Sequence, residues 1–97
     1  QPTEGPLDIP FFNIQVIATP GHKEDCVCYY LPEEKILFTG DTLFQESIGR
    51  TDLPGGDMGT LIHSLNKLVV LPDDTQVYPG HGYPTTIGHE KQYNPYI

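Results

Sequence analysis

The sequence has few basic residues. Lys and Arg together number 5 against 13 Asp and Glu, which gives the 97-residue chain a formal net charge of −8. Proteins that bind nucleic acid cluster Lys and Arg to neutralise phosphates, so this composition argues against a nucleic-acid partner. Long apolar runs are also lacking, and none approaches the roughly 18 residues that cross a bilayer. We therefore expect neither nucleic acid nor a membrane among the partners.

Cysteine is scarce as well. The two cysteines, Cys26 and Cys28, lie two positions apart in a stretch that favours a strand. Side chains at this spacing share one face of a strand, a geometry poorly suited to a disulfide, so we interpret them as small buried thiols. The N-terminal stretch QPTEGPLDIP has neither the basic nor the apolar region of a signal peptide. We therefore expect a reducing, cytoplasmic location.

Proline and glycine, in contrast, number 10 each, and they predict a chain with many turns. A length of 97 residues is enough for one domain. We predict a single domain over residues 1–97. Within it, residues 1–10 are predicted to be an irregular lead-in, because they contain three prolines and no hydrophobic period.

Hydrophobic patterning over the rest of the chain indicates an α/β fold. Residues 11–19 alternate apolar and polar side chains as a half-buried strand does. Residues 26–31 and 35–41 are two further candidate strands, and the short turn between them predicts an antiparallel hairpin. Residues 58–71 place apolar side chains on one helical face after a capping Asp57. A fourth strand over 75–80 and a short helix over 85–93 complete the pattern.

Three of the predicted strands end in the same way. Each is followed by glycine and then by a residue that can bind a metal: His22 after TPG, Asp41 after LFTG and His81 after VYPG. Glycine lets the backbone bend sharply, and the strand fixes the position of the side chain that follows. Two imidazoles and one carboxylate suit a divalent metal with an open position for water. Each residue alone could be an ordinary turn residue, but the repetition favours a shared metal site.

The remaining histidines are predicted to have structural positions. His63 falls opposite the apolar face of the predicted helix, so it is expected in solvent. His89 lies in the polar C-terminal segment. Residues 42–57 show little periodicity, and loops of this length inside compact domains are usually functional.

The stretches TPGH, ILFTGDTLF, SIGRTDLPGGD, VYPGHG and TTIGHEKQYNPYI, in this order, resemble the C-terminal half of metallo-β-lactamase-fold hydrolases. They are most similar to the glyoxalase II-like (hydroxyacylglutathione hydrolase-like) members. The resemblance runs over residues 12–97. It implies one half of an αββα sandwich, with a largely antiparallel sheet and a helix on one face. In SIGRTDLPGGD, Arg50 and Asp52 are expected to form a charged pair in the scaffold around the site. The alternatives are that Arg50 orients the region of Asp41 or that this segment contacts the substrate.

The resemblance also implies roles for the three candidate ligands. His22 is expected to bind the first metal, Asp41 to bridge two metals and His81 to bind the second. Asp41 is thereby the predicted catalytic residue, and zinc the predicted cofactor, with iron possible. The other ligands of the family lie in a His-x-His-x-Asp-His motif that this sequence does not contain. Half of a two-metal site is therefore expected.

Three functions are compatible with these observations. The first is the C-terminal half of a hydrolase in which metal-bound hydroxide attacks a thioester such as a glutathione thioester, with little or no activity in the 97-residue chain alone. The second is a catalytically silent half-domain that binds metal weakly or serves as a partner module. The third is an iron-dependent persulfide dioxygenase relative, since the same ligands suit iron(II). A lone half-sandwich exposes an apolar face, so we expect self-association or a missing N-terminal half as partner. The candidates for this exposed face are Phe12, Ile14, Val16 and Ala18 of the first strand, with neighbours in residues 26–31 and 35–38.

Overall fold

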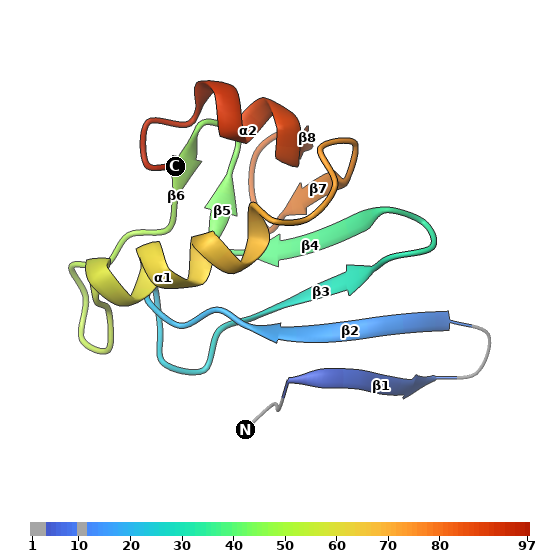
Figure 1. The fold of residues 1–97 in the computed structure, drawn as a ribbon. Helices are drawn as coiled ribbons and strands as arrows, with labels where there is room; N and C mark the ends of the chain where they lie inside the picture. Colours follow the sequence, from blue (N-terminus) through green and yellow to red (C-terminus); the bar gives the residue numbers. More distant parts are fainter. Residues whose placement is uncertain (1–3, 10–11) are drawn as a thin grey trace.

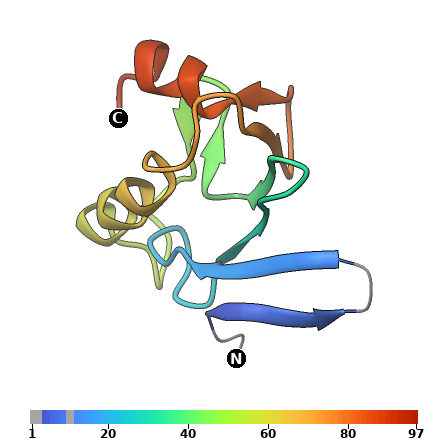
Figure 2. The same ribbon diagram turned by 45° about the vertical axis from the view of Figure 1, so that its right-hand side comes forward.

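The computed structural model describes residues 4–9 and 12–97. The strands are β1 (Gly5–Ile9), β2 (Phe12–Ala18), β3 (Val27–Leu31), β4 (Ile36–Gly40), β5 (Leu43–Phe44), β6 (Ser47–Ile48), β7 (Gln76–Pro79) and β8 (Thr85–Thr86); the helices are α1 (Met58–Leu68) and α2 (Ile87–Tyr93). Within these residues one sheet has the order β1-β2-β3-β4-β7-β8, and β5 pairs with β6 apart from it. Figures 1 and 2 show both helices on one side of this sheet.

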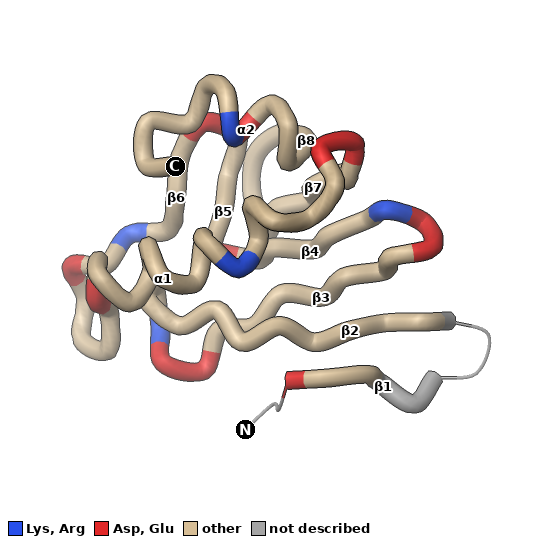
Figure 3. Tube along the Cα trace, in the orientation of Figure 1, with Lys and Arg blue, Asp and Glu red and all other residues tan. Residues whose placement is uncertain are grey.

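The sheet is largely antiparallel, as predicted. Strand β2 pairs antiparallel with β3, and β3 with β4. The β3–β4 connection is the predicted tight hairpin, closed with Lys35 at a φ of 56°. Strands β2, β3, β4 and β7 contain no charged residue, whereas the β3–β4 connection does, so the turn chemistry and the patterning of these strands agree (Figure 3).

The irregular lead-in predicted for residues 1–10 is wrong over Gly5–Ile9, which forms β1 and pairs antiparallel with β2. The remaining residues of that prediction, 1–3 and 10, lie outside the described part of the structure. Proline was the reason for the prediction. Because β1 is an edge strand of the described sheet, Pro6 can sit in it opposite Gln15 without interrupting an inner ladder.

One pair of strands is parallel, and it positions the candidate site. Strands β4 and β7 run side by side in the same direction, with Gly40 opposite Pro79. The amide of Gly80 donates to the carbonyl of Gly40 at 2.8 Å, which extends the pairing past the ends of the strands. The long connection between them contains the β5–β6 hairpin and α1. The residues that follow β4 and β7 therefore emerge at the same edge of the sheet.

Helix α1 covers the inner face of the sheet. Asp57 caps its first turn by accepting from the amide of Thr60 at 2.7 Å, as predicted. The helix ends at Leu68, three residues before the end of the predicted segment, with Val69 as its C-cap. It buries Leu61, Leu65 and Leu68. His63 is exposed, in agreement with its predicted place on the outer face.

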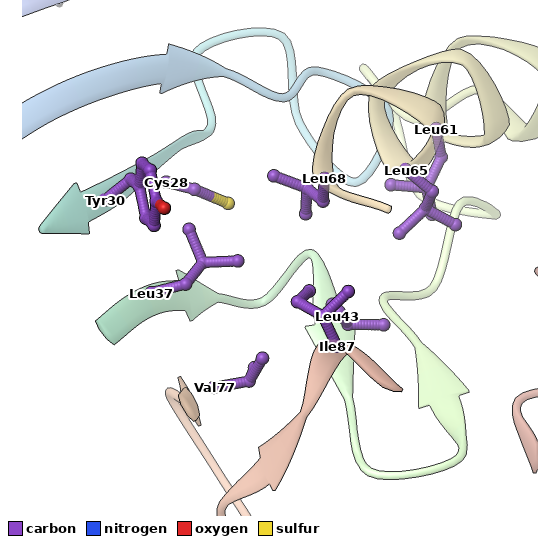
Figure 4. Packing of buried hydrophobic residues seen from close by; sticks show 9 residues of the cluster. All are labelled: Cys28, Tyr30, Leu37, Leu43, Leu61, Leu65, Leu68, Val77 and Ile87. Carbon is purple, nitrogen blue, oxygen red and sulfur yellow. The ribbon is translucent and has the colours of Figure 1, made fainter. Parts of the chain in front are cut away.

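The core joins α1 to the middle of the sheet (Figure 4). Its fully buried members include Leu37 of β4, Val77 of β7 and Ile87 of α2. Cys28 belongs to this cluster, and burial raises the pKa of its thiol to about 11. The thiol is therefore protonated at neutral pH. This confirms the structural interpretation of Cys28; Cys26 is only half-buried, and both cysteines are free.

The opposite face of the sheet is apolar and open. Tyr29, Phe38 and Tyr78 stand in register across β3, β4 and β7 and are 39%, 44% and 39% exposed. The rings of Phe38 and Tyr78 are 5.8 Å apart between centroids. Their chain neighbours Leu37 and Val77 point the other way into the core, because side chains alternate along strands. This row of aromatic side chains is called the open face below.

The first predicted strand contributes less to the open face than expected. Ile14, Val16 and Ala18 were predicted to be exposed there together with Phe12. Val16 is only 4% exposed, and Ile14 and Ala18 are partly buried. The side chain of Phe12 lies outside the described part of the structure. Val16 stands opposite Tyr29 and so lies on the same face of the sheet, but the aromatic side chains of β3, β4 and β7 carry the exposed surface.

We predict that the open face makes the chain self-associate. Removing exposed apolar surface from water stabilises an assembly by roughly 25 cal/mol per Å². Sedimentation equilibrium at micromolar concentration should show species heavier than 10.8 kDa. Phe38→Ser should shift the equilibrium toward monomer. Val70→Ser, which alters a 79% exposed side chain beyond α1, is the matched control and should leave it unchanged. A strictly monomeric wild-type chain would contradict the prediction.

Candidate metal centre

His22, Asp41 and His81 come together at one edge of the sheet. The Nε2 atom of His22 is 3.8 Å from Oδ2 of Asp41, and Nδ1 of His81 is 3.0 Å from Oδ1 of the same carboxylate. Each carboxylate oxygen thus faces a different imidazole. The predicted convergence of the three turns is confirmed as geometry. Exposure rises across the set, with the side chains of His22, Asp41 and His81 exposed by 13%, 42% and 78%.

His22 is the most firmly held of the three. It follows Gly21, whose φ is +142°, and a Cβ there would meet the backbone Cα of Leu61 at 2.4 Å. Only glycine allows this close approach of the turn to α1. The Nδ1 atom of His22 is 2.7 Å from the carbonyl oxygen of Arg50. Because a carbonyl only accepts, Nδ1 carries the proton, and the lone pair is left on Nε2, the atom that faces Asp41.

Asp41 is fixed by the turn that ends β4. Gly40 adopts a φ of +51°, and the amide of Thr42 donates to the carbonyl of Thr39 at 2.9 Å. Gly49 packs against this turn so closely that a Cβ would stand 1.9 Å from the carbonyl oxygen of Asp41 and 3.2 Å from Cβ of His22. Glycine at position 49 is therefore a contact point between the backbone that carries Asp41 and the side chain of His22.

His81 is the least constrained. It lies on the turn after β7, and its ring centroid is 6.1 Å from that of Phe44 on β5. A Cβ at the preceding Gly80 would stand 3.4 Å from Oδ1 of Asp41. The carboxylate therefore sits between two turns, with His81 reaching it from the open side.

The donor set fits a divalent metal, but its atoms are divided between two positions. Among residues 4–9 and 12–97, no group of three or more His, Cys, Asp or Glu side chains is arranged to hold one ion. One side of Asp41 offers Oδ2 with Nε2 of His22, and the other offers Oδ1 with a nitrogen of His81. A carboxylate that presents one oxygen to each side has the geometry of a bridge. The carbonyl partner of His22 is the kind of outer contact that orients a ligating imidazole.

The surroundings of the site are polar and shallow. Arg50 and Asp52 form the predicted charged pair, with Nε and Nη2 of Arg50 donating to the carboxylate at 2.7 and 2.9 Å, and this pair lowers the pKa of Asp52. An open hollow of about 580 Å³ lies beside the site, lined by residues 23–25 and 54–55. None of the three candidate ligands lines it, so it does not mark the candidate centre.

Sequence reasoning missed two contributors to the site, the carbonyl of Arg50 and the close packing of Gly49. A backbone carbonyl has no sequence signal of its own. The glycine in SIGR was the available signal, although nothing in the sequence shows what it packs against. His89, which was not predicted to be a ligand, lies with Nε2 at 2.9 Å from Oε2 of Glu46.

Gly49→Ala is predicted to disturb the site and the fold together. The new methyl group would overlap the carbonyl oxygen of Asp41, so the two turns must separate. We expect a loss of about 1–3 kcal/mol in the free energy of unfolding, measured by urea denaturation. Gly59→Ala, in the first turn of α1 with only Oδ2 of Asp57 at 3.4 Å, is the matched control and should be neutral or slightly stabilising. Equal stability of both variants would contradict the overlap.

Comparison with known proteins places this geometry in a family. The chain is 47% identical over 92 residues to hydroxyacylglutathione hydrolase GloC of Haemophilus influenzae, a match that covers 94% of this chain and 43% of the relative, in its C-terminal part. The crystal structure of the BLEG-1 B3 metallo-beta-lactamase superposes with a TM-score of 0.93 at 49% identity, over 99% of this chain and 46% of that one.

A second solved structure, ETHE1 from Myxococcus xanthus, gives a TM-score of 0.89 at 42% identity, over 98% of this chain and 44% of that one. The chain thus spans less than half the length of these proteins. The family model described as the metallo-beta-lactamase superfamily matches residues 7–81, which include all three candidate ligands. The sheet and its helices are those of a metallo-beta-lactamase fold, and the chain belongs to the metallo-beta-lactamase superfamily.

Proposed function

We propose that this chain forms the C-terminal half of a metal-dependent hydrolase that cleaves a thioester, such as a glutathione thioester. The observation that carries the proposal is the placement of Asp41, which directs one carboxylate oxygen toward His22 and the other toward His81. That arrangement suits a bridge between two divalent ions. The name of the relative from Haemophilus influenzae supports the thioester as substrate class.

The residues of this chain supply binding and orientation rather than proton transfer. A bound pair of divalent ions lowers the pKa of water and polarises a carbonyl group. His22 offers Nε2 because the Arg50 carbonyl holds the proton on Nδ1. Asp41 would contribute negative charge to both positions. No side chain of the described residues is assigned as a general base, and Asp41 is the proposed catalytic residue because it would hold both metal positions.

Zinc is the proposed metal, and iron the alternative. Imidazole and carboxylate donors bind both ions, so the donor set alone does not choose between them. Iron would favour a second function, that of a persulfide dioxygenase relative. The structural similarity to ETHE1 at 42% identity supports this alternative. Metal analysis of protein purified without chelator separates the two, because the hydrolase should carry zinc and the dioxygenase iron.

The 97-residue chain alone is proposed to be weakly active or inactive. Each metal position receives at most two donors from this chain, and the sequence has no His-x-His-x-Asp-His motif to complete them. Under this proposal the missing donors come from an N-terminal half, which would also cover the open face. Without such a half, the chain would be the catalytically silent half-domain considered above.

Asp41→Ala should abolish most of the metal affinity of the chain, because it removes a donor from both positions. Absorption titration with Co²⁺ measures the effect, and we expect the dissociation constant to rise about tenfold or more. Asp52→Ala, which breaks the nearby pair with Arg50, is the control and should change the constant little. Equal binding by the two variants would contradict the assignment of Asp41.

We also predict that the isolated chain hydrolyses a glutathione thioester at a rate close to background, measured by release of the free thiol. Addition of the N-terminal half of a relative such as the Haemophilus influenzae enzyme should raise the rate in zinc, and Asp41→Ala should prevent the increase. Steady turnover by the isolated chain, lost in Asp41→Ala, would show that this half is sufficient.

A further inference from the structure

A buried carboxylate fastens the β5–β6 hairpin to the C-terminal helix. Glu90 of α2 is 0% exposed. Its Oε1 atom accepts from the amide of Glu46 at 2.8 Å, and its Oε2 atom accepts from the hydroxyl of Thr85 at 2.7 Å. Asn94 donates from Nδ2 both to Oε1 of Glu90 at 2.8 Å and to the carbonyl of Ser47 at 3.0 Å. One residue of α2 and the C-cap of this helix thereby hold two consecutive residues of the hairpin, Glu46 and Ser47.

The carboxylate at this position calls for an explanation. Burial of a charged group is costly, and a well-packed apolar side chain would often be as stable or more so. Among residues 4–9 and 12–97, Glu90 forms no ion pair with Lys, Arg or His. Three hydrogen-bond donors compensate for its burial: the amide of Glu46 in the hairpin turn, Nδ2 of Asn94 and the hydroxyl of Thr85. Asn94 also contacts the hairpin, through the carbonyl of Ser47. The bonds therefore point to a need for a fixed hairpin.

The hairpin turn is itself in an unfavourable conformation. Phe44 pairs with Ser47, so residues 45 and 46 form a two-residue turn. Glu46 has a φ of 58°, in the left-handed region that residues other than glycine, asparagine and aspartate rarely adopt. The hydrogen bond from the Glu46 amide to Glu90 holds this residue in place. Loss of that bond should release the turn.

The second strand of the hairpin leads directly to the candidate metal centre. β6 ends at Ile48, and the next residue, Gly49, donates from its amide to the carbonyl of Thr42 at 3.1 Å. The residue after that is Arg50, whose carbonyl oxygen contacts Nδ1 of His22 at 2.7 Å. Arg50, whose carbonyl sets the tautomer of His22, lies only four positions after Glu46 in the turn held by Glu90.

We propose that Glu90 is a positioning residue for His22. By fixing the β5–β6 hairpin, it holds the Arg50 carbonyl at Nδ1 and thereby presents the lone pair of Nε2 to the metal position. The inference concerns the imidazole of His22 in the protein itself, and its relevance to metal binding rests on the proposed function. Glu90 touches neither substrate nor metal and acts through the hairpin.

The test reads the tautomer of His22 directly. Long-range ¹H–¹⁵N spectra of the ¹⁵N-histidine-labelled, metal-free chain at pH 8 should show the Nδ1–H form. In Glu90→Ala this preference should be lost, and the dissociation constant for Co²⁺ should rise about tenfold or more. Glu90→Gln should behave as the wild type, because its amide oxygen can accept from Glu46 and Asn94 while its amino group donates to Thr85.

Two further variants keep the test decisive. Lys91→Ala changes another residue of α2. It breaks the ion pair between Lys91 and Asp73, which does not involve the hairpin, and should leave His22 unchanged. Asn94→Ala removes the bond to Ser47 and should shift His22 in the same direction as Glu90→Ala. If the amides of Leu65 and Val77 lose protection from hydrogen exchange in Glu90→Ala, the core has opened, and Asn94→Ala decides the question.

The outcomes separate this inference from the proposed function. Folded Glu90→Ala and Asn94→Ala variants that keep the Nδ1–H form and wild-type Co²⁺ affinity would overturn the positioning role, whatever the metal content of the wild type. A wild-type chain that does not bind Co²⁺, but whose His22 tautomer depends on Glu90, would support the positioning role and contradict the metal site.

Discussion

The parallel pairing of β4 with β7 is the constraint on which the candidate site depends. In an otherwise antiparallel sheet, this single parallel step brings the ends of two strands to the same edge. Asp41 follows one and His81 the other, so both emerge within reach of each other. Crevices at the carboxyl ends of parallel strands are recurrent binding places in α/β proteins for the same reason. An antiparallel pairing here would put the two residues at opposite edges.

The parallel step also creates the connection that completes the site. A parallel pair needs a crossover, and here the crossover holds the β5–β6 hairpin and α1. The hairpin delivers Gly49 and Arg50 to the turns that carry Asp41 and His22. Helix α1 packs its backbone against Gly21 and so fixes the turn before His22. Backbone contacts at Gly49, Arg50 and Gly21 therefore support the site.

The two faces of the sheet differ in what covers them. The inner face, with Leu37 and Val77, forms the core with α1. The open face keeps Tyr29, Phe38 and Tyr78 in solvent. A small domain buries only part of its apolar surface, and a row of aromatic side chains on an exposed sheet is typical of a surface that is covered by a partner. The same division explains the exposure of His81, because the edge of the sheet has no second layer over it.

The sequence by itself determined the types of the main elements and the identity of the candidate ligands. Alternation in residues 11–19 and the helical period from Met58 are local patterns, and the Gly-His and Gly-Asp turns are local chemistry. Tertiary structure decided the rest. The strand β1, in a segment with several prolines, exists because β2 offers an edge to pair with, and the parallel step joins residues some 40 positions apart. The Arg50 carbonyl, the Gly49 contact and the buried Glu90 are backbone or packing relations between distant segments, and such relations leave no periodic signal in the sequence because they depend on which surfaces meet once the chain has folded.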